Sequence, residues 1–116
     1  MARTPGEVEV INPYAASKAA AWDFARMFVR TEGWPIVGVM PFQTYGPGQP
    51  TRTVLGAALK AARAGDNFPL TSGEQRRDWI YIDDVVAGVL AAADANGIDG
   101  ETIELGTGVS TPVHEV

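Results

Sequence analysis

Residues 12–41 read NPYAASKAAAWDFARMFVRTEGWPIVGVMP, and this stretch decides the fold class. Asn12 followed by Pro13 is typical of the N-cap and first position of a helix. Gly33, followed by a Trp-Pro pair, is typical of a helix end. We therefore expect a helix from Pro13 to just before Gly33. The apolar run 36–40, which ends at a proline, indicates a buried strand.

The rest of the chain continues this alternation of helices and short apolar runs. The sequence predicts a second helix at 53–64, ended by Gly65, and a third helix that is capped by Asp83 or Asp84 and ends at 96–97. Short strands are expected at 68–71, 78–82 and 102–105. The expected connections are a loop or extended arm at 1–11, a turn-rich loop at 43–51 and a turn at 106–108, after which Thr111-Pro112 opens a new helix. Helices that alternate with strands indicate an α/β fold. Because only two or three strands are available, we expect an incomplete sheet.

Composition excludes several classes of function. The 116 residues carry 9 basic and 14 acidic side chains, for a net charge of -5. This balance argues against nucleic acid or an anionic membrane as a partner, since both favour a basic surface. There is no cysteine and a single histidine, His114, so we expect neither disulfides nor a Cys- or His-based metal site. The expectation is a soluble, cytoplasmic protein.

The first predicted helix contains one anomaly. At about 100° per residue, its apolar stripe also contains a lysine, and the stripe comprises Tyr14, Lys18, Ala21, Trp22, Ala25, Phe28 and Val29. Tyr14 and Lys18 are four residues apart and therefore neighbours on one face. An ammonium beside a phenol favours the ionised phenolate, which can exchange a proton with a substrate hydroxyl. Spacing alone leaves a second interpretation open, in which Tyr14 packs and Lys18 extends its charge from the edge of the stripe.

Four segments together resemble one enzyme family. Residues 14–18 (YAASK) resemble the YxxxK motif of the short-chain dehydrogenase/reductase superfamily. Three further segments resemble the extended branch of that superfamily, the NAD-dependent nucleotide-sugar epimerases and dehydratases; these are 36–48 (IVGVMPFQTYGPG), 73–87 (GEQRRDWIYIDDVVA) and 101–111 (ETIELGTGVST). Their order matches that of the family. The resemblance implies a partial Rossmann-like, doubly wound fold.

The resemblance also implies roles for individual residues. Tyr14 would be the catalytic acid/base, and Lys18 would hold the nicotinamide ribose hydroxyls of NAD or NADP. Pro41 and Phe42 would lie beside the nicotinamide. Gln43, where the family commonly has Asn, would contact the nucleotide-sugar. The sequence departs from the family again just before Pro41, where Met40 replaces the usual Arg.

The second substrate-binding residue implied by the resemblance is Arg77, which would hold the substrate diphosphate. Without the resemblance, a solvent-exposed surface charge is the preferred interpretation of Arg77. Asp78 is interpreted as structural, and Gly46-Pro47-Gly48 as a plain tight turn.

The family's Gly-rich cofactor loop, which binds pyrophosphate at a helix N-terminus, has no counterpart before Tyr14. Residues 106–111 (GTGVST) only half-match that loop and are interpreted as a turn. We therefore expect an internal to C-terminal fragment with little or no dehydrogenase activity of its own. Residues 1–48 would belong to the nucleotide-binding domain, 49–82 to the substrate lobe, and 83–116 would return to the nucleotide-binding domain.

A second hypothesis comes from a different class of protein. The chain could be a non-enzymatic α/β module that self-associates and buries its apolar stripe between copies. The family often dimerises through the helix that carries its tyrosine, and a homo-oligomer is expected on either hypothesis. A packing interface gains little from a lysine at its centre, so Lys18 favours the enzyme.

Overall fold

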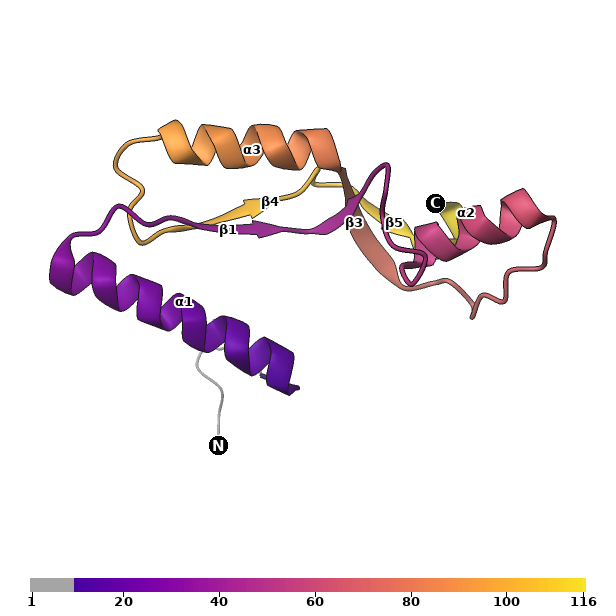
Figure 1. The fold of residues 1–116 in the computed structure, drawn as a ribbon, viewed down its shortest axis with the longest axis horizontal. Coiled ribbons are helices and arrows are strands. Elements are labelled where there is room, and N and C mark those ends of the chain that lie inside the picture. Colours follow the sequence, from indigo (N-terminus) through magenta and orange to yellow (C-terminus); the bar gives the residue numbers. More distant parts are fainter. Residues whose placement is uncertain (1–9) are drawn as a thin grey trace. The chain divides into compact units, whose positions relative to one another are not determined.

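The computed structural model describes residues 10–116, in which helices and strands alternate along the chain (Figure 1). The helices are α1 (Pro13–Glu32), α2 (Val54–Ala64) and α3 (Ile82–Asp94). The strands are β1 (Gly38–Pro41), β2 (Gln43–Tyr45), β3 (Arg76–Tyr81), β4 (Thr102–Leu105) and β5 (Ser110–Pro112), and a 3₁₀ turn, Val113–Glu115, follows β5. Of the arm expected at 1–11, all but the last two residues lie outside the described part.

The capping signals of α1 act as the sequence predicts. The Asn12 side chain accepts a hydrogen bond from the Ala15 backbone N–H at 2.8 Å, and Pro13 is the first helical residue. Gly33 ends the helix with a φ of 68°, a left-handed conformation that glycine adopts at little cost. The predicted bounds of α1 are therefore confirmed.

The second helix starts one residue later than expected, because Thr53 is its N-cap. The Thr53 hydroxyl accepts a hydrogen bond from the Gly56 N–H at 3.2 Å. Gly65 ends α2 in the left-handed region, as predicted.

The prediction that Asp83 or Asp84 caps the third helix is wrong. Helix α3 begins at Ile82, its N-cap is Tyr81, and no side chain caps it. Both aspartates lie inside the first turn instead, where a carboxylate stabilises the helix through the peptide dipoles. The helix ends at Asp94, two residues before the expected end.

Five short strands form two small sheets, so the expected number of two or three was too low. Strands β1 and β4 form one pair, and the order in the other sheet is β2-β3-β5. Strand β2 pairs with β3 in parallel, with Gln43 opposite Trp79 and Tyr45 opposite Tyr81. Strand β5 runs antiparallel to β3. Three helices around a few short strands in an incomplete sheet confirm the predicted fold class.

Three strand predictions need correction. Residues 43–45 form the strand β2 and not part of the expected loop, because they pair with the distant β3. Residues 68–71 form no strand, consistent with Pro69, which lacks the N–H that a ladder needs. Thr111 and Pro112 end the edge strand β5 instead of opening a helix.

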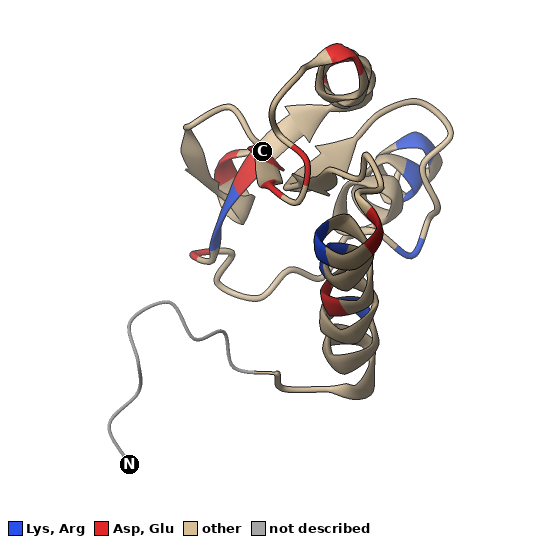
Figure 2. Cartoon of the chain, turned by 90° about the vertical axis from the view of Figure 1, so that its left-hand side faces the viewer, with Lys and Arg blue, Asp and Glu red and all other residues tan. Residues whose placement is uncertain are grey.

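The described part divides into two compact units. One contains 10–38 with 96–102, and the other contains 39–95 with 103–116. In the second unit, α3 packs against β3 and β2, and the buried hydrophobic residues there are Ile80, Val85 and Ala92. Acidic and basic residues are spread over several elements, and α1 carries both signs (Figure 2). Within residues 10–116, no helix combines the length and the hydrophobicity that crossing a membrane requires.

Candidate functional site

The first group of predicted site residues lies on the N-terminal turns of α1. The Lys18 Nζ lies 5.7 Å from the centroid of the Tyr14 ring, within the range of a cation–π contact. The Tyr14 side chain is 71% exposed. The neighbouring Ser17 hydroxyl donates to the Tyr14 carbonyl at 2.7 Å. Tyr14 and Lys18 are thus brought together on an exposed face.

The middle and the C-terminal part of α1 anchor the helix within its unit. The Trp22 ring lies so close to Gly38 that a β-carbon there would overlap it. The Phe28 ring stacks on Trp34 with 4.6 Å between centroids. Trp22 and Phe28 of the apolar stripe therefore pack against neighbouring residues, whereas Tyr14 and Lys18 at the start of the helix are exposed.

Tyr14 and Lys18 suit the cofactor that the sequence implies. Among residues 10–116, neither the Tyr14 hydroxyl nor the Lys18 ammonium forms a hydrogen bond or a salt bridge with another side chain. Both groups carry N–H or O–H donors, which match the acceptor oxygens of a ribose diol. The chemistry of this donor set therefore fits NAD or NADP at its nicotinamide ribose.

The second group of predicted site residues lines a cavity of about 440 Å³ in the other unit. Its lining comprises Phe42, Gln43, Arg76, Arg77, Asp78, Gly108 and Ser110. The cavity brings together three of the predicted site residues, Phe42, Gln43 and Arg77. Pro41 ends β1 and is not part of this lining.

The two adjacent arginines differ in how they are bound. The Arg76 Nε donates to the Ser110 hydroxyl at 3.3 Å, and its guanidinium also donates to the Ser110 carbonyl. The Arg77 Nη1 donates to the Arg76 carbonyl at 2.8 Å. Arg76 therefore joins β3 to β5, while within residues 10–116 the other donors of Arg77 have no hydrogen-bond partner and can bind an anion.

Asp78 fixes the wall of the cavity. Its Oδ1 accepts hydrogen bonds from the Thr107 N–H at 2.8 Å and the Thr107 hydroxyl at 2.7 Å. Its Oδ2 accepts one from the Gly108 N–H at 2.8 Å. The Thr107 backbone and hydroxyl donors, with a smaller effect from Gly108, lower the pKa of Asp78. These contacts support the structural interpretation of Asp78. Residues 106–109 join β4 to β5, with a bend at Gly108.

Sequence reasoning did not assign four of the lining residues to the site. Asp78 was interpreted as structural and Gly108 as part of a turn, and Arg76 and Ser110 were given no role. The signal for Arg76 was the Arg-Arg pair at 76–77, of which only the second residue matched the family pattern. Ser110 gave no local signal, because its position depends on the antiparallel pairing of β5 with β3. Among residues 10–116, no three His, Cys, Asp or Glu side chains gather as metal ligands would.

Comparisons with known proteins identify the family of this chain. A sequence model of the NAD dependent epimerase/dehydratase family matches residues 2–106. The chain is 34% identical over 96 residues to dTDP-glucose 4,6-dehydratase from Escherichia coli, which covers 82% of this chain and 26% of that protein. The chain thus spans about a quarter of the length of the curated relatives that it matches.

Two solved structures extend the likeness to the fold. A dTDP-glucose 4,6-dehydratase from Streptomyces venezuelae with NAD bound matches with a TM-score of 0.80 and 29% identity, over 96% of this chain and 34% of that one. A UDP-glucuronic acid 4-epimerase from Bacillus cereus, in complex with UDP-glucuronic acid and NAD, matches with a TM-score of 0.83 and 25% identity, over 98% of this chain and 37% of that one. The fold is Rossmann-like, as expected. This chain belongs to the NAD dependent epimerase/dehydratase family.

Proposed function

We propose that this chain is part of an NAD- or NADP-dependent enzyme that epimerises or dehydrates a nucleotide-linked sugar. The observation that carries the proposal is the exposed pair of Tyr14 and Lys18, one helical turn apart on α1. The cavity that holds Gln43 and Arg77 supports it, since it adds an arginine suited to phosphate. The B. cereus relative was solved with both a nucleotide-sugar and NAD.

Tyr14 acts in this proposal as the acid/base. Its phenolate oxygen takes the proton from a substrate hydroxyl as the carbon that bears it is oxidised, and returns a proton in the reverse step. A bound NAD or NADP would supply the hydride acceptor for this oxidation. The Lys18 ammonium holds the ribose hydroxyls and stabilises the negative charge on the phenolate.

The remaining residues orient the two ligands. Pro41 and Phe42 lie beside the nicotinamide in the proposal, at the point where β1 ends. Gln43 and Arg77 bind the nucleotide-sugar, Gln43 through its amide and Arg77 through paired donors to the diphosphate oxygens. The proposal also divides the chain into three parts. The nucleotide-binding domain comprises residues 1–48 and 83–116, and the substrate lobe comprises residues 49–82.

The role of Lys18 is tested with nicotinamide riboside, which carries the ribose and nicotinamide but no phosphate. We expect weak binding, with a Kd of about 1 mM or above, seen as ¹⁵N-resolved NMR shifts at Tyr14 and its neighbours. Lys18→Ala removes those shifts. Lys60→Ala, which changes the chain's other lysine, leaves them in place. Shifts that survive in Lys18→Ala would contradict the proposed role.

The role of Arg77 is tested with thymidine diphosphate, followed at the amides of Gly108 and Ser110, which line the same cavity. Arg77→Ala is expected to weaken binding about tenfold or more, because a charge-assisted phosphate contact is lost. Arg52→Ala is the matched control, since Arg52 is exposed and lies outside the lining. Equal affinity in Arg77→Ala and Arg52→Ala would refute the assignment.

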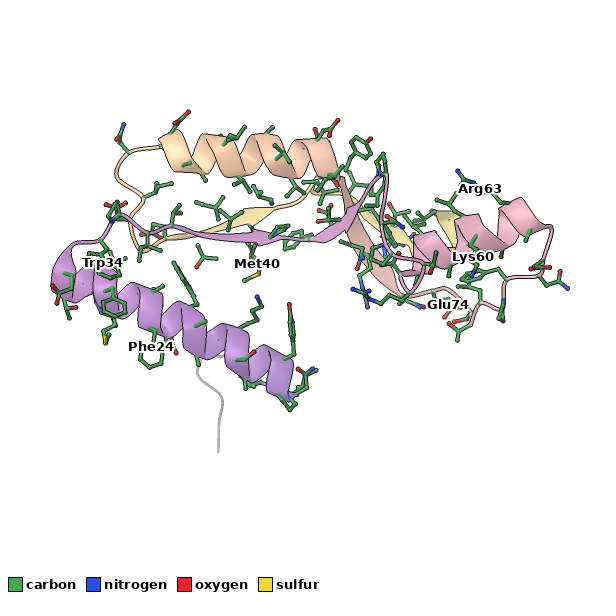
Figure 3. All side chains as sticks on the ribbon, in the orientation of Figure 1. Phe24, Trp34, Met40, Lys60, Arg63 and Glu74 are labelled. Carbon is green, nitrogen blue, oxygen red and sulfur yellow. The ribbon has the colours of Figure 1, made fainter. Side chains whose placement is uncertain are left out.

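A second candidate function is self-association without catalysis. The exposed Phe24 on α1, 63% exposed and labelled in Figure 3, favours it, because a large aromatic side chain in water suits an interface. Binding of nicotinamide riboside that is lost in Lys18→Ala separates the two candidates, and turnover is followed by NMR of the sugar product, because epimerisation and dehydration return the hydride and leave no net absorbance change at 340 nm. We expect little or no turnover from these 116 residues alone, and clear turnover would exclude a purely structural role.

A further inference from the structure

A second cavity of about 720 Å³ lies in the unit that contains α2. Its lining comprises Tyr45, Gly46, Pro47, Gly48, Gln49, Thr51, Leu55, Gly56, Leu59, Lys60, Arg63 and Tyr81. None of these residues lines the cavity that contains Arg77. The volume is in the range of small-molecule sites.

The two cavities take residues from opposite ends of the same pair of parallel strands. Gln43 at the start of β2 and Arg77 near the start of β3 belong to the first cavity. Tyr45 and Tyr81, which end the two strands and face each other in the register, belong to the second. The second cavity therefore lies at the carboxyl ends of β2 and β3, where ligands of open α/β sheets commonly bind.

The charge of this lining is positive. Lys60 and Arg63 project from α2 (Figure 3), and among the described residues of the lining none is acidic. Neither cation forms a salt bridge within residues 10–116. In a chain with a net charge of -5, two unpaired cations beside one cavity favour an anionic ligand.

Aromatic rings and an ordered loop complete the cavity. The Tyr45 and Tyr81 rings lie 5.4 Å apart at an interplanar angle of 58°. The Gln49 side chain accepts from the Gly46 N–H at 3.1 Å and donates to the Thr53 hydroxyl at 3.1 Å. These bonds tie the 46–49 loop to the start of α2, so that the cavity wall is fixed before a ligand arrives.

We propose that this cavity is a second ligand site, which takes an aromatic phosphate of mononucleotide size. The tyrosine rings contact the planar part of the ligand, and Lys60 and Arg63 bind its phosphate. The site is separate from the proposed substrate cavity, and the proposal does not depend on the proposed catalytic function.

The test is calorimetric titration of the 116-residue chain with AMP, adenosine and inorganic phosphate, with NMR shifts to locate the binding. We expect AMP to bind at least about tenfold more tightly than either part alone, with shifts at Gly46, Gly48 and α2. The double variant Lys60→Gln, Arg63→Gln keeps much of the side-chain stems and is expected to weaken AMP binding about tenfold or more. Arg52→Gln removes one charge outside the lining and leaves the affinity unchanged.

Three outcomes would overturn the proposal. The first is no saturable AMP binding. The second is equal affinity in the double variant and the unsubstituted chain, with unchanged far-UV circular dichroism. The third is loss of AMP binding in Arg77→Ala with shifts at Gly108 and Ser110, which would place AMP in the other cavity. Should the double variant fail to fold, Arg63→Gln alone is compared with Arg52→Gln. Weaker AMP binding in Arg63→Gln would support the site, and equal affinity in the two variants would exclude it.

Discussion

At the scale of single residues, Asp78 connects β3 to the segment between β4 and β5 through its carboxylate. Its carboxylate accepts three hydrogen bonds from Thr107 and Gly108, and these lower its pKa below the ordinary value of 3.8. A carboxyl whose pKa is lowered on folding stabilises the fold above its unfolded pKa. That stabilisation is lost as the pH falls from about 3.8 through the lowered value.

We therefore predict that Asp78→Asn is less stable than the unsubstituted chain at neutral pH and loses less of its stability on acidification. Urea unfolding at several pH values between neutrality and about 2 measures this slope. Thr107→Val removes the hydroxyl donor to Asp78, at 2.7 Å, and the acceptor of the Val109 N–H, but keeps the backbone donor of Thr107, and it should reduce the slope partway. If Asp78→Asn and the unsubstituted chain have the same slope below pH 4, the hydrogen bonds to Asp78 do not contribute as described.

At the scale of elements, Gly56 allows the 46–50 loop to approach α2 closely. It is buried in the first turn, and a β-carbon there would overlap the Pro50 carbonyl oxygen, a backbone atom that cannot easily move. Gly56→Ala would gain at most about 1 kcal/mol of helix propensity and lose about 1–3 kcal/mol to overpacking. We expect a net loss of about 1 kcal/mol in the free energy of unfolding.

Gly88 in α3 is the matched control for this prediction. A β-carbon at Gly88 would meet the methyl groups of Leu105 at 2.8 Å, and those groups lie at the end of a flexible side chain. Gly88→Ala should therefore change stability by no more than about 0.5 kcal/mol, because helix propensity offsets the crowding. Equal losses in Gly56→Ala and Gly88→Ala, measured by urea unfolding, would contradict the role of the Pro50 contact.

The helices were predictable to within a few residues because their signals are local. The capping residues act through backbone groups three to five residues away; they are Asn12, Gly33, Thr53 and Gly65. The first turn of α3 was misassigned, since Tyr81 caps it without a side-chain hydrogen bond. Strands β2 and β5 were missed because both depend on β3, which lies more than 30 residues away.

The candidate site shows the same division between local and distant signals. Tyr14 and Lys18 are one turn apart, so that helix geometry alone predicts their proximity. Arg77 and Gln43 were identified by resemblance, and their shared cavity depends on the pairing of β2 with β3. Ser110 lies at the cavity because β5 pairs with β3. No periodicity in the sequence encodes which strands will pair.

At the scale of the whole molecule, little of the described chain is buried. Ile80, Val85 and Ala92 are the buried hydrophobic residues within 10–116, and no residue of the 20-residue helix α1 is buried. A folded chain that leaves so much apolar surface in water gains by covering it. The large exposed apolar surface is the reason for predicting a homo-oligomer, and the composition alone could not indicate that surface.

We predict that the chain self-associates through the face of α1 around Phe24. A hollow of about 350 Å³ lies there, into which a side chain of a second copy can fit, and its lining comprises Ala20, Asp23, Phe24 and Met27. A two-fold interface would place the same hollow on both copies. Phe24→Glu puts a charge into this contact and should shift the chain to a monomer in sedimentation velocity at about 50 μM, well above the Kd of a micromolar dimer.

Leu90→Glu tests whether the effect is specific to that face. Leu90 on α3 is 62% exposed, close to the 63% of Phe24, so both variants place a carboxylate where an equally exposed apolar side chain was. We expect Leu90→Glu to sediment like the unsubstituted chain. If both variants become monomeric, general hydrophobic attraction drives the association; if only Leu90→Glu does, the interface is on α3. A monomer in the unsubstituted chain would exclude self-association through either helix.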